Sequence, residues 1–140
     1  MKKYTLSTEI DLDFLMLGLT CHYRDYRMAW LLNKHVEINL SKIVPYPLFD
    51  SKSNTEYEFP LFAFDDKENY ISWNLVSNKT PGSIIIPEKK EHDYFLVLKG
   101  SFEYLEKGEL ISKIRNIPGV LLCTEIFPET LKSKKNLYFE

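Results

Sequence analysis

The sequence predicts a single α+β domain over residues 1–140, in which a mostly antiparallel sheet carries two helices on one face. Apolar runs of strand length alternate along the chain with two segments of helical periodicity, and 140 residues lie within the size of one domain. A chain of this length buries about 68% of its unfolded surface, so a hydrophobic core suffices without disulfides or a metal.

The first part of the chain predicts a strand, a helix and a second strand. The apolar run 13–21 has the length of a buried strand. Good helix formers dominate residues 24–36. One side of that helix carries, at spacings of three and four, Met28, Leu31, Leu32 and His35. Residues 37–44 alternate polar and apolar side chains, which predicts a half-buried strand that ends at Pro45.

The middle of the chain predicts a hairpin rich in aromatic residues. Its strands are expected at 56–64 and 70–77, joined by the polar turn 65–69. Pro60 cannot donate to a sheet ladder, so the first of these strands is expected at an edge or with a bulge. Residues 78–83 contain a Pro-Gly pair and predict a further turn.

The last part repeats the order strand, helix, strand. Residues 93–98 form an apolar run, residues 103–117 carry one apolar helical stripe, and Pro118 stops that helix before the strand 120–126. Two such units around a hairpin predict a two-layer sandwich of the ferredoxin-like or ACT-like kind.

Composition narrows the classes of function. The net charge of −2 provides no general attraction to nucleic acid or to an anionic membrane. The two cysteines lack Cys-x-x-Cys spacing, which argues against a zinc ribbon or a redox pair. Neither the apolar core of a signal peptide nor a run of about 18 apolar residues is present. We therefore expect a cytoplasmic protein without a cofactor or a membrane partner.

The residue spacing does not favour a metal site, a cysteine nucleophile or a phosphate-binding loop. The three histidines are far apart and form no His-x-His or His-Glu-x-x-His pattern. Cys21 and Cys123 each lie in an apolar strand, where a free cysteine usually packs as a small hydrophobe. The five glycines do not follow any phosphate-binding spacing.

With these segments placed, the chain resembles the IPExxxDY family of bacterial proteins over most of its length. The matching residues are Ile86-Pro87-Glu88, Asp93-Tyr94-Phe95, the helix segment 25–35, Trp73-x-Leu75, Asn78-Lys79, Ile114-x-Asn116-Ile117-Pro118 and the segment 131–137. Four residues separate Glu88 from Asp93, where the family's label implies three. The family has no assigned function, so the resemblance implies neither catalytic residues nor a ligand.

The segment after Ile86 permits two interpretations. Glu88, His92 and Asp93 could form an acid–base constellation, in which a carboxylate orients the imidazole. Alternatively, Pro87 fixes an extended lead-in to a strand, and the polar residues that follow form a solvated loop.

The start of the first helix permits two interpretations as well. Tyr23, Arg24 and Arg27 are residue types that dominate binding interfaces, yet the arginines could equally form surface ion pairs with nearby acids. Our leading hypothesis is a binding module without catalytic activity, for a protein partner or a small ligand. Its candidate contacts are Tyr23, Arg24, Arg27, Asn78, Lys79, Glu88, His92 and Asp93.

The sequence leaves the partner open. Edge strands of such sheets often pair across a two-fold axis, so a homodimer is one expectation. The small enzyme based on Glu88, His92 and Asp93 is a second hypothesis, and it requires a cleft on which these side chains converge. A third is association with RNA or the ribosome through the basic segment Lys132–Lys135.

Overall fold

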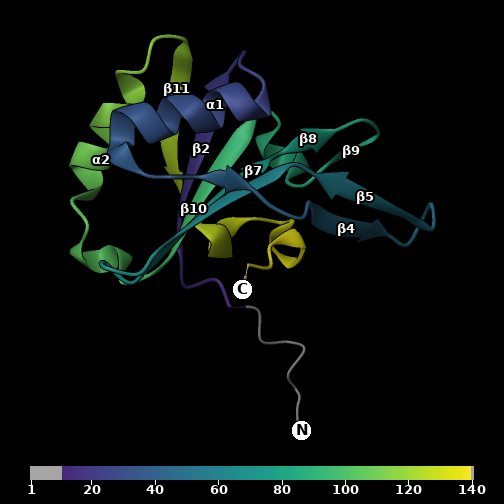
Figure 1. The fold of residues 1–140 in the computed structure, drawn as a ribbon. Helices are drawn as coiled ribbons and strands as arrows, with labels where there is room; N and C mark the ends of the chain where they lie inside the picture. The colour runs from purple at the N-terminus through teal and green to yellow at the C-terminus, as the bar shows by residue number, and fades with distance from the viewer. Residues whose placement is uncertain (1–10, 140) are drawn as a thin grey trace, which may run out of the picture.

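The computed structural model describes residues 11–139, which form an α+β fold around a six-stranded sheet (Figure 1). Along the chain the sheet is built from β2 (Leu15–Cys21), β3 (Ser41–Lys42), β6 (Leu61–Asp66), β7 (Ile71–Ser77), β10 (Tyr94–Gly100) and β11 (Val120–Ile126). Their spatial order is β11-β2-β10-β7-β6-β3, and every pairing between them is antiparallel. The expectation of no signal peptide rests on residues 1–10, outside the described residues.

Two helices and two small hairpins complete the described chain. The helices are α1 (Asp25–Leu32), which continues into a π-helical turn at Asn33–Glu37, and α2 (Lys107–Arg115). The hairpins pair β4 (Tyr46–Asp50) with β5 (Thr55–Phe59), and β8 (Lys79–Thr80) with β9 (Ser83–Ile84). Within residues 11–139, neither helix has the length and apolar character that crossing a membrane requires.

Both faces of the sheet are buried, each by a different kind of cover. Leu15, Leu17 and Leu19 of β2 face the core that α1 and α2 complete, so both helices lie on one face, as predicted. Met16, between them, points to the opposite core, which includes residues from the β4–β5 hairpin and from the segment 127–139. This burial of both faces explains why β2 and β10 are almost continuously apolar.

The helix connections skip one strand. β10 and β11 both run antiparallel to β2, so they are parallel to one another with β2 between them, and α2 connects them. β2 and β7 flank β10 in the same way, and α1 lies on the connection between them. The α2 connection therefore has split strand–helix–strand geometry, whereas the connection that carries α1 also includes β3, β4, β5 and β6 before it reaches β7.

The predicted strand at 37–44 is wrong except for Ser41–Lys42. The Asn33 carboxamide accepts a hydrogen bond from the Leu40 N–H at 2.7 Å and donates one to the Leu40 carbonyl at 3.1 Å. This pair of bonds holds the chain in a loop after the π-helical turn. Ile38 and Leu40 then pack beneath the helices rather than on the face of a sheet, which accounts for their alternation.

The prolines divide the aromatic hairpin differently from the prediction. The expected strand 56–64 is two strands, because Pro60 separates β5 from β6 and sends them to different sheets. Pro47, expected to lie beyond a strand, is inside β4 opposite Glu58. The two-stranded β4–β5 hairpin leaves an outer edge on each strand, where the missing N–H of a proline costs nothing.

The second helix is shorter than its apolar stripe. Residues Phe102–Tyr104 form a 3-10 turn, and α2 begins only at Lys107. The strand that follows, Val120–Ile126, has the predicted bounds. Strand β10 begins at Tyr94, one residue after its predicted start.

Gly18 occupies the closest approach between β2 and the loop before β10. A β-carbon added there would lie 2.5 Å from Cδ2 of the His92 ring, which is well inside van der Waals contact. His92 itself is buried, so its ring has little room to retreat. The position therefore requires glycine because of packing.

We expect Gly18→Ala to reduce the free energy of unfolding by about 1–3 kcal/mol, because the new methyl group must displace the His92 ring. Gly108→Ala is the matched control: no atom lies within 4 Å of its added β-carbon, and alanine favours helix over glycine by up to about 1 kcal/mol. Urea unfolding of both variants measures the difference. Equal stability of the two variants would contradict the packing argument.

Candidate functional site

The candidate residues from the sequence fall in two places. Tyr23, Asn78, Lys79, Glu88, His92 and Asp93 lie around the ends of β2 and β7 and the start of β10, a region called here the junction. Arg24 and Arg27 lie at the start of α1. The two groups differ in what their polar atoms contact.

Asn78 is fully buried at the centre of the junction. Its Nδ2 donates to the carbonyls of Lys89 and His92 at 3.1 and 3.0 Å, and its Oδ1 accepts from the Ile86 N–H at 2.9 Å. All three partners are main-chain groups of the loop that leads into β10. Asn78 therefore stabilises the loop: both of its N–H donors are used, and its side chain is fully buried.

Asp93 connects three strands. Its Oδ2 accepts from the Cys21 N–H at 3.0 Å at the end of β2, and its Oδ1 lies 3.2 Å from the Lys79 ammonium at the start of β8. The main-chain N–H of Asp93 also donates to the Leu19 carbonyl at 2.7 Å. The carboxylate thus fixes where β10 begins against β2.

His92 packs on Gly18 and bonds to Thr20. The Thr20 hydroxyl donates to the Glu91 carbonyl at 2.7 Å, so it can only accept from His92 Nδ1, which lies 3.1 Å away. The neutral ring therefore carries its proton on Nδ1. Burial lowers the pKa of His92 below its ordinary value, although the nearby Glu91 carboxylate, 3.9 Å from Nε2, acts in the opposite direction.

Glu88 faces the segment that covers the second side of the sheet. Its two carboxylate oxygens accept from the N–H and the hydroxyl of Ser133, both at 2.8 Å. Desolvation tends to raise the pKa of this carboxyl, but the Ser133 hydrogen bonds outweigh it, so the pKa lies below its ordinary value. The lead-in expected to be extended is a 3-10 turn over Pro87–Lys89, which directs Glu88 toward Ser133.

The three residues of the enzyme hypothesis therefore form hydrogen bonds with different parts of the fold. Glu88 bonds to Ser133, His92 bonds to Thr20, and Asp93 bonds to β2 and β8. The nearest cleft, about 310 Å³, is lined by Asp93 but by neither Glu88 nor His92. The three side chains connect segments of the fold, and they do not form an acid–base pair around a shared cavity.

Two tyrosines join the junction to the helix layer. The Tyr94 hydroxyl donates to the Tyr23 carbonyl at 2.6 Å, and the Tyr23 hydroxyl donates to the Pro118 carbonyl after α2. Burial raises the pKa of Tyr94 well above its ordinary value, so it remains a neutral donor. Tyr23 is thereby committed to a contact within the fold.

The outer face of α1 has the opposite character. Tyr26, Arg27, Trp30 and Lys34 follow one another at spacings of one, three and four, and all are exposed; we call them the α1 stripe. Tyr26 and Trp30 expose 64% and 51% of their surface. The Arg27 guanidinium and the Lys34 ammonium lie 5.2 and 5.3 Å from the centre of the Trp30 ring, one helical turn to either side.

Sequence reasoning named Arg27 but missed Tyr26, Trp30 and Lys34. The available signal was their position relative to the apolar stripe of the same helix. Met28, Leu31 and Leu32 define the buried side, and Trp30 falls outside it. A tryptophan on the solvent side of an amphipathic helix is a better indication of a binding surface than a charged pair at the helix start.

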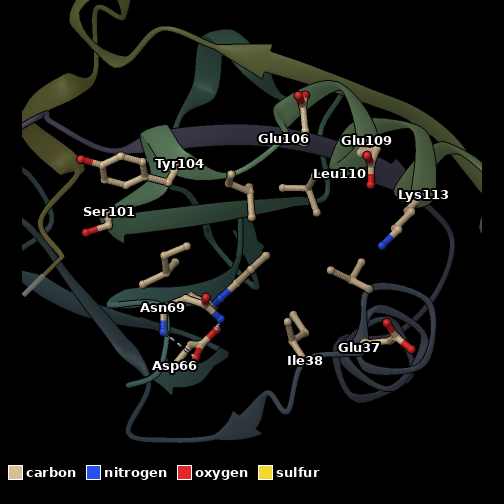
Figure 2. A pocket seen from close by; sticks show the side chains of 14 residues that line it. Glu37, Ile38, Asp66, Asn69, Ser101, Tyr104, Glu106, Glu109, Leu110 and Lys113 are labelled. Carbon is tan, nitrogen blue, oxygen red and sulfur yellow. Dashed lines mark hydrogen bonds between the residues drawn. The ribbon is translucent and has the colours of Figure 1, made fainter.

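A second cleft, of about 300 Å³, opens between α2 and the β6–β7 turn. In Figure 2, Glu109 and Lys113 come from the α2 wall and Asp66 lies on the opposite side. The Asp66 carboxylate bonds to the main chain and side chain of Asn69, so it stabilises its own turn. Trp73 also lines this cleft, and its buried Nε1 has no hydrogen-bond partner among residues 11–139.

Residues 11–139 contain neither a group of side chains arranged to bind a metal ion nor an activated cysteine nucleophile. Histidine, cysteine and carboxylate side chains do not form a cluster of three or more there that could hold a metal ion. Burial raises the pKa of Cys21, and it raises the pKa of Cys123 to about 11 despite the nearby Arg115. Both thiols are therefore protonated at neutral pH, and neither is an activated nucleophile.

Comparison with known proteins does not identify a relative of this chain. No protein-family model matches the chain, and the searches of curated proteins and of solved structures also return no match.

The buried His92 predicts a pH-dependent stability. Unfolded histidine titrates near pH 6.5, and the folded pKa is lower, so the unfolded state gains its proton first as the pH falls. The free energy of unfolding should therefore decline from about pH 6.5 downward. His92→Asn keeps a donor near the Nδ1 position and should flatten this decline.

Urea unfolding between about pH 7.5 and pH 5 tests this expectation. His22→Asn is the control, because it removes an exposed histidine that lies outside the contacts of His92 with Gly18 and Thr20. An equal decline in the wild type and in His92→Asn would show that other groups cause it.

Proposed function

We propose that this protein is a cytoplasmic binding module without catalytic activity, which contacts an acidic protein partner through the α1 stripe. The observation that carries the proposal is the exposed Trp30 with Arg27 and Lys34 beside its ring. Tryptophan and arginine dominate the energetics of protein interfaces, and exposing them to water has no folding benefit.

The charge of the α1 stripe selects the partner. It has two cations and no carboxylate, while the nearby Asp25 carboxylate accepts from the Tyr26 N–H at 2.8 Å. An acidic segment that docks here would pair with Arg27 and Lys34 while an apolar side chain covers the Trp30 ring. Exposed aromatic rings at helical spacing are well suited to a helix or an extended segment.

The other candidate residues support the proposal indirectly. Tyr23, Asn78, Lys79, Glu88, His92 and Asp93 are engaged within the fold, so the junction acts as the scaffold beneath α1. The proposal includes membership in the IPExxxDY family, whose signature residues Ile86, Glu88 and Asp93 all make these structural contacts. It also includes a ferredoxin-like or ACT-like core, supported by the split crossover through α2 and by the strand order β11-β2-β10-β7.

Trp30→Ala should weaken the partner complex by about 30-fold or more, the loss typical of a hot-spot residue. The partner is first captured with the full-length protein from nuclease-treated extract of the native host and then purified. Its affinity is measured by calorimetry against the wild type, Trp30→Ala, Arg27→Glu and the control Tyr104→Ala, which changes an exposed tyrosine outside the α1 stripe.

Affinity should also fall as salt rises, because the cations of the stripe are solvent-exposed. A partner that binds Trp30→Ala as tightly as the wild type would place the interface elsewhere. Capture that disappears after nuclease treatment would favour the RNA hypothesis based on Lys132–Lys135, whose lysines are exposed.

A specific observation also favours a homodimer formed through β11. Among residues 11–139, this seven-residue strand pairs with β2 alone, and it exposes 59% of Leu121 and 47% of Leu122. Its one charged residue, Glu125, pairs with Lys107 at 2.9 Å, so two copies could meet without like-charge repulsion. The opposite edge, β3, is only two residues long and contains Lys42, both of which discourage pairing.

A register shift at Leu121 leaves residues 122–126 as the regular part of the edge. We expect light scattering to give the mass of a dimer for the wild type and of a monomer for Leu122→Lys, since a lysine on an edge strand disfavours pairing. Tyr104→Lys is the control for added charge at an exposed site. A wild type that stays monomeric up to millimolar concentration rules out this dimer.

A further inference from the structure

A largely apolar cleft lies on the sheet face away from the helices. Its volume is about 550 Å³, which is within the range of small-molecule sites. The floor is formed by β6 and β7, and the walls come from the segment 43–47 and from Tyr138 and Phe139. It is separate from both the α1 stripe and the junction, which share no residue with it.

The floor of this cleft contains a polar side chain with few hydrogen-bond partners among residues 11–139. Asn74 is only 8% exposed, and its cross-strand neighbours are Ala63 and Val97, neither of which has a polar side chain. Within residues 11–139, its carboxamide makes one hydrogen bond, a long one of 3.4 Å from Nδ2 to the Ser72 hydroxyl. The carboxamide lines the cleft, so a ligand there can reach it.

The walls of the cleft expose apolar side chains to water. Val44 and Tyr138 line the cleft and expose 80% and 69% of their surface, and Ile43 beside them is also exposed. Covering these side chains would remove apolar area from water, which is favourable by about 25 cal/mol per Å². Apolar walls above a carboxamide and a hydroxyl are the usual composition of a pocket for a small organic molecule.

Charge identifies the class of ligand. Among residues 11–139, those that line the cleft include no aspartate, glutamate, lysine, arginine or histidine. An ionised ligand would therefore lose its hydration there without gaining a counter-ion. The Asn74 carboxamide offers both a donor and an acceptor, and a neutral amide is the head group that matches both at once.

We propose that the cleft between β6–β7 and the segment 43–47 binds a small neutral molecule that has an apolar body and an amide-type head group, with Asn74 as the residue that recognises the head group. The apolar body contacts Val44 and Tyr138 at the rim. The site is independent of the proposed protein interface on α1, so either can fail without the other.

Three probes of nearly equal size test the proposal: benzamide, benzoate and benzylamine, which are neutral, anionic and cationic at neutral pH. Each is titrated into the isotope-labelled full-length protein, and amide chemical shifts give both the affinity and the location. We expect benzamide to shift residues of β6, β7 and the segment 43–47. We expect it to bind at least tenfold more tightly than either charged probe.

Two variants identify the contacts. Asn74→Leu removes the hydrogen bonds at similar volume and should weaken benzamide binding about fivefold. Because a buried substitution can disturb folding, Tyr138→Ala provides a second variant at an exposed rim position and should also weaken binding. Tyr104→Ala, in the cleft beside α2, is the control and should have no effect.

Three results would overturn the proposal. The first is no detectable benzamide binding up to its solubility limit. The second is equal binding of a charged probe, and the third is an Asn74→Leu variant that keeps its native spectrum and the wild-type affinity. Shifts confined to the α2 cleft would likewise move the site away from Asn74.

Discussion

The three hydrogen bonds of the buried Asn78 side chain are the interaction on which the rest of the structure depends. They fix the loop 86–92 by its own main chain, and the position of that loop sets where β10 starts. Because β10 is the central strand between β2 and β7, an error there would shift side chains on both faces of the sheet. A buried amide that satisfies main-chain groups specifies one loop conformation more strictly than apolar packing does.

From this loop the constraint spreads in two directions. Asp93 connects the loop to the end of β2, and through Tyr94 and Tyr23 it reaches the chain after α2. Glu88 reaches the other way, to Ser133, and so fixes the segment that covers the second face. Glu88 and Asp93 therefore join the two layers of core, which explains their presence without a ligand. The surfaces of residues 11–139 on which our proposals rest are the α1 stripe, the β11 edge and the cleft over Asn74.

Much of the fold was predictable, whereas little of the candidate site was. The strand 120–126 and both helices follow from local periodicity, because a buried face repeats at a fixed spacing. The residues at 37–44 have the same alternation, but the Asn33 carboxamide holds them in a loop. Six of the eight candidate residues proved to be engaged within the fold. The sequence marks such residues as polar and clustered, and it does not distinguish a polar group that is used internally from one that is free.

The sequence by itself determined the α+β class, the position of most strands and the two helices on one face. These features depend on neighbouring residues, whose spacing alone decides which side chains share a face. Only the tertiary structure decided that Glu88 meets Ser133, 45 positions away, and that Asn74 lies on the floor of a cleft with one long hydrogen bond among residues 11–139. Such pairings depend on how distant segments pack over the sheet. That packing is set by the summed burial of many residues and leaves no local signal in the chain.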